Sequence, residues 1–337
     1  FRATRRSTEP SHERRSPACG GVATAEEPPE LVAEQQGSKG EPNESCGSFS
    51  LSTFWDTLSE AVKATSQEAT KLSLMFSKPP VPTGKECMEL CESMQKSILS
   101  LSTVFFWLPQ SQGVRLRLRI RDATVDLLEG LDQLLEAVLS SHGLSLSQEQ
   151  LLSTGGVWAA CDQFSQLPRE NRSAVQNELT MQQRLVKDAL EELQQALAEA
   201  PPVDEEDEEH WSQSERELVC ETQGLIKASA AALRKLSSSV RSNGRLETQK
   251  EIQELDGLAD AAKHISPGVD DLALSLYPPV ERQLVQENVF RLAAMLRKLL
   301  ELTRSSHVCE ESDVAWVDFL DGAVEHNLEK IRAVLQT

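Results

Sequence analysis

Apolar residues recur at intervals of three and four along most of the chain from residue 53 onward. This spacing places them on one face of an α-helix, and most runs stop at proline or glycine. The pattern therefore predicts an all-α protein with five helices in each half. The runs of the first half cover 55–76, 87–105, 116–138, 151–161 and 175–197. Those of the second half cover 211–240, 252–262, 266–277, 285–299 and 317–335.

The stretch from Val114 to Arg121 is ambiguous because arginines alternate with aliphatic residues. Alternation alone indicates a β-strand. A strand here would have no partner, and the helical spacing continues through the stretch to Val138. We therefore predict a helix.

Two prolines, Pro201 and Pro202, precede six consecutive acidic residues from Asp204 to Glu209. Proline interrupts a helix, and adjacent carboxylates repel one another and resist burial. We predict an acidic linker between two helical bundles of about five helices each. The expected divisions are a disordered leader at 1–48, an N-terminal bundle at 49–200, the linker at 201–210 and a C-terminal bundle at 211–337.

Composition narrows the class of function. The net charge of −19 opposes direct binding to nucleic acid, whose phosphates would be repelled. Seven cysteines, an odd number at irregular spacing, indicate reduced intracellular thiols. No apolar run reaches the roughly 18 residues of a membrane-spanning helix, so we expect no membrane association.

Candidate catalytic and metal-binding residues have simpler explanations. Cys87 and Cys91 share the apolar face of their helix, and we expect them to pack as buried residues without metal. Ser266 is predicted to cap a helix with Pro267 at its first position, which explains the serine better than a triad with His264 and Asp270 does. We therefore predict no catalytic residue, no cofactor and no metal site.

Two segments are candidate partner-binding sites. The first is a short helix around Asp270 and Asp271, followed by Tyr277 and Pro278, which we expect to line a cleft between the bundles. A structural role for the same segment is an equal alternative. The second segment contains Arg115, Arg117, Arg119 and Arg121, of which Arg115 and Arg119 lie on one row of a helix. These arginines could dock an acidic partner or form salt bridges inside the protein.

Several motifs resemble the cyclin-D-binding protein family. They are ISPGVDDLALSLYPPV at 265–280, GVWAACDQFSQLPREN at 156–171, ATVDLLEGLDQLLEAV at 123–138, WSQSERELVCETQGLIKASAAALRKL at 211–236 and SSHV at 305–308. The resemblance extends from about residue 50 to the end.

The resemblance implies a non-enzyme that binds D-type cyclins and helix–loop–helix transcription regulators. Such a protein restrains phosphorylation of the retinoblastoma protein and negatively regulates the cell cycle. We expect it in both cytoplasm and nucleus, and adaptor proteins remain open as further partners. The alternative is a vinculin- or talin-like adaptor in cytoskeletal or adhesion signalling, a hypothesis that rests on fold analogy alone.

Overall fold

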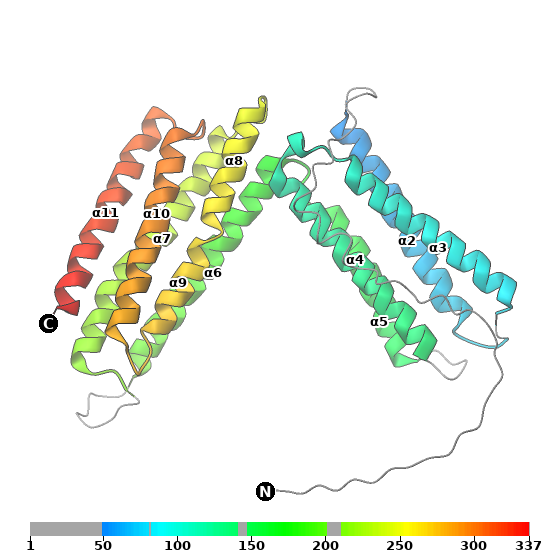
Figure 1. The fold of residues 1–337 in the computed structure, drawn as a ribbon, viewed down its shortest axis with the longest axis horizontal. Helices are drawn as coiled ribbons and strands as arrows, with labels where there is room; N and C mark the ends of the chain where they lie inside the picture. Colours follow the sequence, from blue (N-terminus) through cyan, green and yellow to red (C-terminus); the bar gives the residue numbers. More distant parts are fainter. Residues whose placement is uncertain (1–48, 81, 141–146, 201–209, 337) are drawn as a thin grey trace, which may run out of the picture. The chain divides into compact units, whose positions relative to one another are not determined.

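A computed structural model describes residues 49–80, 82–140, 147–200 and 210–336 (Figure 1). Within these ranges the regular structure is entirely helical, which confirms the all-α prediction, including the helix at 114–121. The predicted leader and nearly all of the acidic linker lie outside the described residues. The helices are α2 (Leu51–Met75), α3 (Gly84–Trp107), α4 (Val114–Ser140), α5 (Gln148–Gln163), α6 (Asn171–Glu199), α7 (Gln213–Asn243), α8 (Gln249–Ala262), α9 (Ile265–Ser275), α10 (Arg282–Ser305) and α11 (Glu311–Leu335), with short 3-10 turns η1 (Gln110–Gln112) and η2 (Phe164–Gln166).

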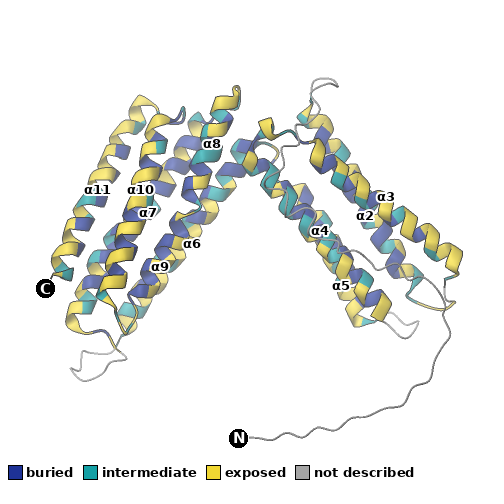
Figure 2. Ribbon diagram, viewed as in Figure 1, coloured by how far each residue is buried: buried dark blue, intermediate teal, exposed yellow. Residues whose placement is uncertain are grey.

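The first bundle consists of α2, α3, α4 and α5. α2 packs on α3, α4 packs on α5, and α2 and α5 also touch. Figure 2 shows the buried residues as a dark stripe along each helix. The fully enclosed side chains include Phe54, Leu58, Leu101, Leu116 and Leu127. All of these except Phe54 belong to the periodic runs in the sequence, so the hydrophobic face of each helix becomes the core.

The second bundle contains α6 through α11 around a separate core. α6 packs on α7, α8 and α9, and it supplies four fully buried side chains to this core. They are Val175, Leu179, Val186 and Leu193. The N-terminal bundle predicted at 49–200 includes this helix, whereas its fully buried side chains lie in the second core. Periodicity shows which face of a helix is apolar, whereas the choice of partner is a tertiary property.

Side chains of the second bundle hold the first turn of α4. The Asp256 carboxylate on α8 accepts hydrogen bonds from the backbone N–H groups of Val114 (2.7 Å) and Arg115 (3.1 Å). The buried Asn171 side chain, at the start of α6, donates to Asp256 (2.9 Å) and accepts from the N–H of Leu116 (3.0 Å). The backbone N–H groups of the first turn, which have no acceptor within the helix, thus bond to side chains distant in the sequence.

The start of α9 differs from the prediction. The helix begins at Ile265 with His264 in the N-cap position and no side-chain cap, so Ser266 lies inside the helix. Ser266 is buried, and its backbone N–H donates to the Gln182 side chain of α6 at 3.3 Å. α9 follows α8 almost directly. The acceptor that a capping serine would otherwise provide comes instead from Gln182 of α6.

Glu251 makes the stability of the α7–α8 connection dependent on pH. Its carboxylate accepts from the Arg245 guanidinium at 2.8 Å and from the Thr248 backbone at 3.0 Å. The Arg245 hydrogen bond, followed by those of Thr248, lowers the pKa of Glu251 from 4.5 to about 2. Because the folded pKa lies below the unfolded one, this stabilisation is present above about pH 4.5 and is lost as the pH falls through about 2.

We expect Glu251→Gln to lower the unfolding midpoint in urea at neutral pH. The difference from the original chain should shrink as the pH falls from about 4.5 toward 2, since protonated glutamate and glutamine then accept similarly. Urea titrations of both chains at a series of pH values measure this difference in midpoint. A difference that stays constant across that range would contradict the lowered pKa of Glu251.

The structure contradicts the expected burial of both cysteines on α3. Cys91 is exposed and Cys87 is half-buried, whereas the buried positions of this helix include Leu90, Met94 and Leu101. Both sets of residues recur at intervals of three and four, so spacing alone did not show which of them faces the core. The prediction that the two cysteines are buried was therefore wrong.

Cys91→Ser is therefore expected to change the free energy of unfolding by no more than about 0.5 kcal/mol, as is usual for exposed positions. Met94→Ser, one turn away and buried, should cost several times more. Chemical denaturation of both variants measures the contrast. A comparable loss from both would restore the buried assignment of Cys91.

Candidate partner-binding site

The acidic pair on α9 has a structural partner. Asp271 forms an ion pair with Arg291 of α10 (Oδ2–Nη1, 3.2 Å), and its backbone carbonyl accepts from Asn288. Asp270 is exposed, and its pKa is raised by partial burial, then by the charges of Asp271 and Glu192. Asp271 thus contributes to bundle packing, while Asp270 presents a carboxylate in an already acidic environment.

The aromatic end of the same segment packs on Trp211, just before α7. The Tyr277 ring lies 5.6 Å from the Trp211 ring, and the Trp211 indole donates to the Leu276 carbonyl at 2.5 Å. Tyr277 remains 36% exposed, and Pro278–Pro279 follows as a cis peptide. The main packing partners of α9 are α6 and α10, within its own bundle. A docking role for Asp270, Asp271, Tyr277 and Pro278 stays a prediction.

The arginines of α4 do not form one basic surface. Arg115 is mostly buried and pairs with Asp260 of α8 at 3.2 Å. Arg117 lies over the Phe105 ring at 5.3 Å, and burial lowers the pKa of its guanidinium. Arg121 pairs with Asp122, so among the four only Arg119 is both exposed and without an ion pair to another described residue. Arg115 thus matches the salt-bridge alternative, and Arg119 remains a candidate for docking.

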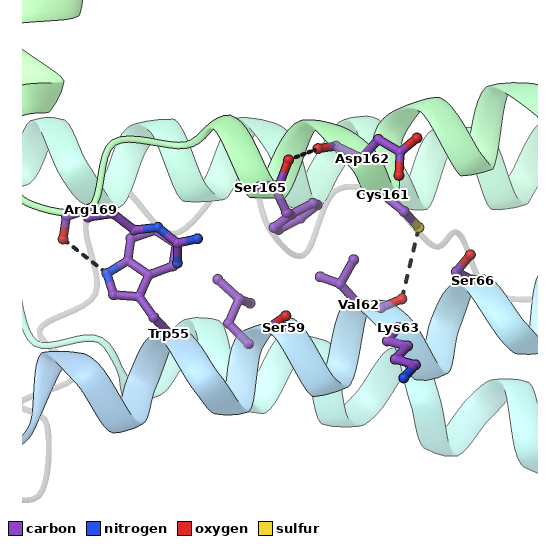
Figure 3. Close-up of a pocket in the computed structure, with 11 residues that line it drawn as sticks. Trp55, Ser59, Val62, Lys63, Ser66, Cys161, Asp162, Ser165 and Arg169 are labelled. Atoms are coloured by element: carbon purple, nitrogen blue, oxygen red, sulfur yellow. Dashed lines mark hydrogen bonds between the residues drawn. The ribbon is translucent and has the colours of Figure 1, made fainter.

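A pocket of about 300 Å³ lies between α2 and the end of α5 (Figure 3). Its apolar lining comes from Trp55, Leu58, Val62 and Phe164. Polar side chains also line it, namely Ser59, Lys63, Ser66, Cys161, Asp162, Ser165 and Arg169. This site was not predicted from the sequence. Its only local signal is the row of polar residues on α2, Ser59, Lys63 and Ser66, at spacings of four and three.

Two contacts shape the ends of the pocket. The Arg169 guanidinium stacks over the Trp55 indole at 4.6 Å, and the indole N–H donates to the Arg169 carbonyl at 3.0 Å. At the other end the Cys161 thiol contacts the Val62 carbonyl at 3.9 Å. Burial raises the pKa of Cys161, so the thiol stays protonated and is a poor nucleophile. The arrangement suits binding of an apolar group rather than covalent chemistry.

The described residues contain no cluster of histidine, cysteine and acidic side chains that could hold a metal ion. In the same part of the chain, no helix combines the length and apolarity needed to cross a bilayer. The candidate sites are apolar or charged surfaces of helices. The described residues thus define an all-helical protein whose candidate sites lie on helix surfaces.

Comparison with known proteins identifies the family. Residues 57–199 match the N-terminal model of the Grap2 and cyclin-D-interacting family, and residues 202–301 match its C-terminal model. This chain therefore belongs to the Grap2 and cyclin-D-interacting family. The two models meet just after α6, although the buried side chains of α6 lie in the second core.

Related proteins match along most of the chain. The cyclin-D1-binding protein 1 homolog of Danio rerio is 62% identical over 312 residues, which cover 88% of this chain and 91% of the relative. The Xenopus laevis homolog is 43% identical, with 86% and 91% covered. Human cyclin-D1-binding protein 1 is 34% identical, with 88% and 89% covered. The family resemblance found in the sequence is confirmed.

Proposed function

We propose that this protein binds D-type cyclins and acts without catalysis. The observation that supports the proposal most directly is the 62% identity, over 88% of the chain, to a protein named for binding cyclin D1. By occupying the cyclin, the protein would restrain phosphorylation of the retinoblastoma protein and so slow cell-cycle progression. The acidic surface, with a net charge of −19, favours partners with basic patches.

We extend the proposal to helix–loop–helix transcription regulators and to a distribution between cytoplasm and nucleus. The support is the family resemblance together with the acidic charge, which disfavours direct contact with DNA. The protein would act on such regulators by sequestering them. Binding of naked DNA by the purified protein alone would contradict this part of the proposal.

A direct binding assay tests the main proposal. Purified chain is titrated with purified cyclin D1 by calorimetry, and actin filaments serve as the arm for the cytoskeletal alternative. We expect saturable binding to cyclin D1 with a dissociation constant of about 1 μM or tighter, and no cosedimentation with actin. Actin binding without cyclin binding by the folded protein would overturn the proposal in favour of the adaptor.

The same assay tests the predicted docking residues. Asp271→Lys should cost up to about 1 kcal/mol of stability, because it replaces one half of a partly exposed ion pair. Asp270→Lys should leave stability unchanged or raise it, since it relieves repulsion with Asp271 and Glu192. Weaker cyclin binding by Asp270→Lys at an unchanged melting temperature supports docking at α9. Intact binding by both variants would leave α9 with a structural role alone.

A further inference from the structure

We propose that the groove between α2 and α5 binds an amphipathic α-helix of a partner protein, with acidic residues beside the apolar stripe of that helix. The α2–α5 groove is defined here by two rows of residues and the pocket between α2 and the end of α5. The α2 row is Ser59, Lys63, Ser66, Thr70 and Leu74, and the α5 row is Leu151, Gly155, Trp158 and Asp162. The inference does not depend on cyclin D1 being the partner.

The two rows lie along an antiparallel helix pair. Gln150 donates to the Ser73 carbonyl at 2.7 Å near one end, and Trp158 donates to the Thr70 hydroxyl at 3.0 Å further along. The Trp55–Arg169 contact closes the other end. The spacings of three and four keep each row on one face of its helix. The two rows therefore extend beside about 19 residues of α2, or roughly 28 Å, and the pocket occupies the Trp55 end of this length.

Exposed apolar side chains lie at one end of this length. Leu74, Leu151 and Trp158 are 65%, 52% and 46% exposed. At the Trp55 end the apolar pocket residues Leu58 and Phe164 are themselves buried, so the charged side chains of the lining dominate there. Exposed apolar side chains on two adjacent helices are the contacts that the apolar stripe of a docked amphipathic helix makes.

Gly155 leaves open space on the α5 row, as Gly84, Gly156, Gly257 and Gly322 do elsewhere. A Cβ atom built at Gly155 meets nothing within 4 Å, and the only positive-φ glycine in the described chain is Gly113. Neither packing nor backbone conformation in this fold thus requires a glycine here, although glycine weakens a helix interior relative to alanine. The missing side chain leaves room for another backbone to approach α5.

Charge selects the kind of helix that fits. Lys63 and Arg169 line the pocket, and neither has a carboxylate within ion-pair distance among the described residues. Asp162 is the only acidic residue in the pocket lining. A protein of net charge −19 thus presents two cations and one acid at this pocket. Acidic residues flanking the apolar stripe of a partner helix would pair with them.

Two labelled peptides test the proposal on the full chain. Each has about 18 residues with leucine at i, i+3, i+4 and i+7 spacing, and the flanking positions carry glutamate in one peptide and lysine in its twin. Fluorescence anisotropy measures binding. We expect the acidic peptide to bind at least about tenfold more tightly than the basic twin. Equal affinity of the two peptides, or no binding by the acidic one, would overturn the proposal.

Matched variants locate the binding site. Gly155→Gln should keep or raise the melting temperature while weakening the acidic peptide by about tenfold or more, because its side chain occupies the groove. Gly156→Gln, the same change on an adjacent open position turned away from the α5 row, should leave affinity unchanged. Lys63→Glu should weaken binding about tenfold, while Lys96→Glu, an exposed lysine of α3, should not.

Equal effects of Gly155→Gln and Gly156→Gln, or of the two lysine substitutions, would overturn the assignment to this groove. The same glycine variant also tests whether a second copy of this chain occupies the groove. Light scattering of the chain alone tests for self-association. A dimer that Gly155→Gln dissociates would identify a second copy of this chain as the occupant and would also overturn the proposal.

Discussion

A fragment that spans residues 170–337 is expected to fold cooperatively, whereas one that spans 211–337 is not. The shorter fragment lacks α6, whose side chains Val175, Leu179, Val186 and Leu193 are fully buried in the second core. Burying four such side chains contributes roughly 6–12 kcal/mol before entropy is subtracted, which is comparable to the roughly 5–15 kcal/mol stability of a whole domain. Circular dichroism melts of the two fragments measure the difference.

A substitution pair in the full chain controls for effects of truncation. Leu179→Ala should cost about 2–5 kcal/mol, while Leu185→Ala on the same helix, which is 43% exposed, should cost much less. Cooperative melting of the 211–337 fragment at the temperature of the longer one, with equal costs for both substitutions, would return α6 to the first bundle.

Gly113→Ala is expected to destabilise the protein by about 3–5 kcal/mol, through backbone strain and broken hydrogen bonds. Gly113 has φ 107° and ψ 140°, a conformation open almost only to glycine. A Cβ atom there would also lie 2.0 Å from the Asn171 side chain. Asn171 is buried and bonds both Leu116 and Asp256, so it cannot move aside without losing those contacts. Denaturant titration measures the loss.

The clash and the strain can be separated. Gly84→Ala adds the same methyl group where nothing lies within 4 Å, and it should change stability little. Adding Asn171→Ala to Gly113→Ala removes the clash but keeps the strained backbone, so the combined cost should be less than the sum of the two single costs. Additive costs would show that the side chain of Asn171 does not oppose residue 113.

Much of the secondary structure was predictable because helical periodicity is a local property. The helix at 114–140 was predicted through a stretch that alternates like a strand, since the apolar spacing continues on both sides of it. Local reasoning failed where two explanations share one spacing. Cys91 and Leu90 are neighbours on the apolar stripe of α3, yet only Leu90 faces the core.

The candidate sites also combine locally predictable features with contacts that only the folded chain makes. Arg115 was recognised as part of a charged row, but its partner Asp260 lies 145 residues away. The pocket between α2 and α5 was not predicted, because its walls come from helices that meet only in the folded chain. No local pattern encodes the pairing of two such faces.

The sequence alone determined that this protein is helical, where most helices run, that the chain is strongly acidic, and which family its motifs resemble. Those properties follow from spacing, charge and composition, each of which acts over a few residues or over the chain as a sum. Only the tertiary structure decided that α6 joins the second core, that Gln182 rather than a capping serine serves the start of α9, and that α2 and the end of α5 enclose a pocket. An apolar face can be buried against any complementary face, so the partner is selected by the packing of the whole chain.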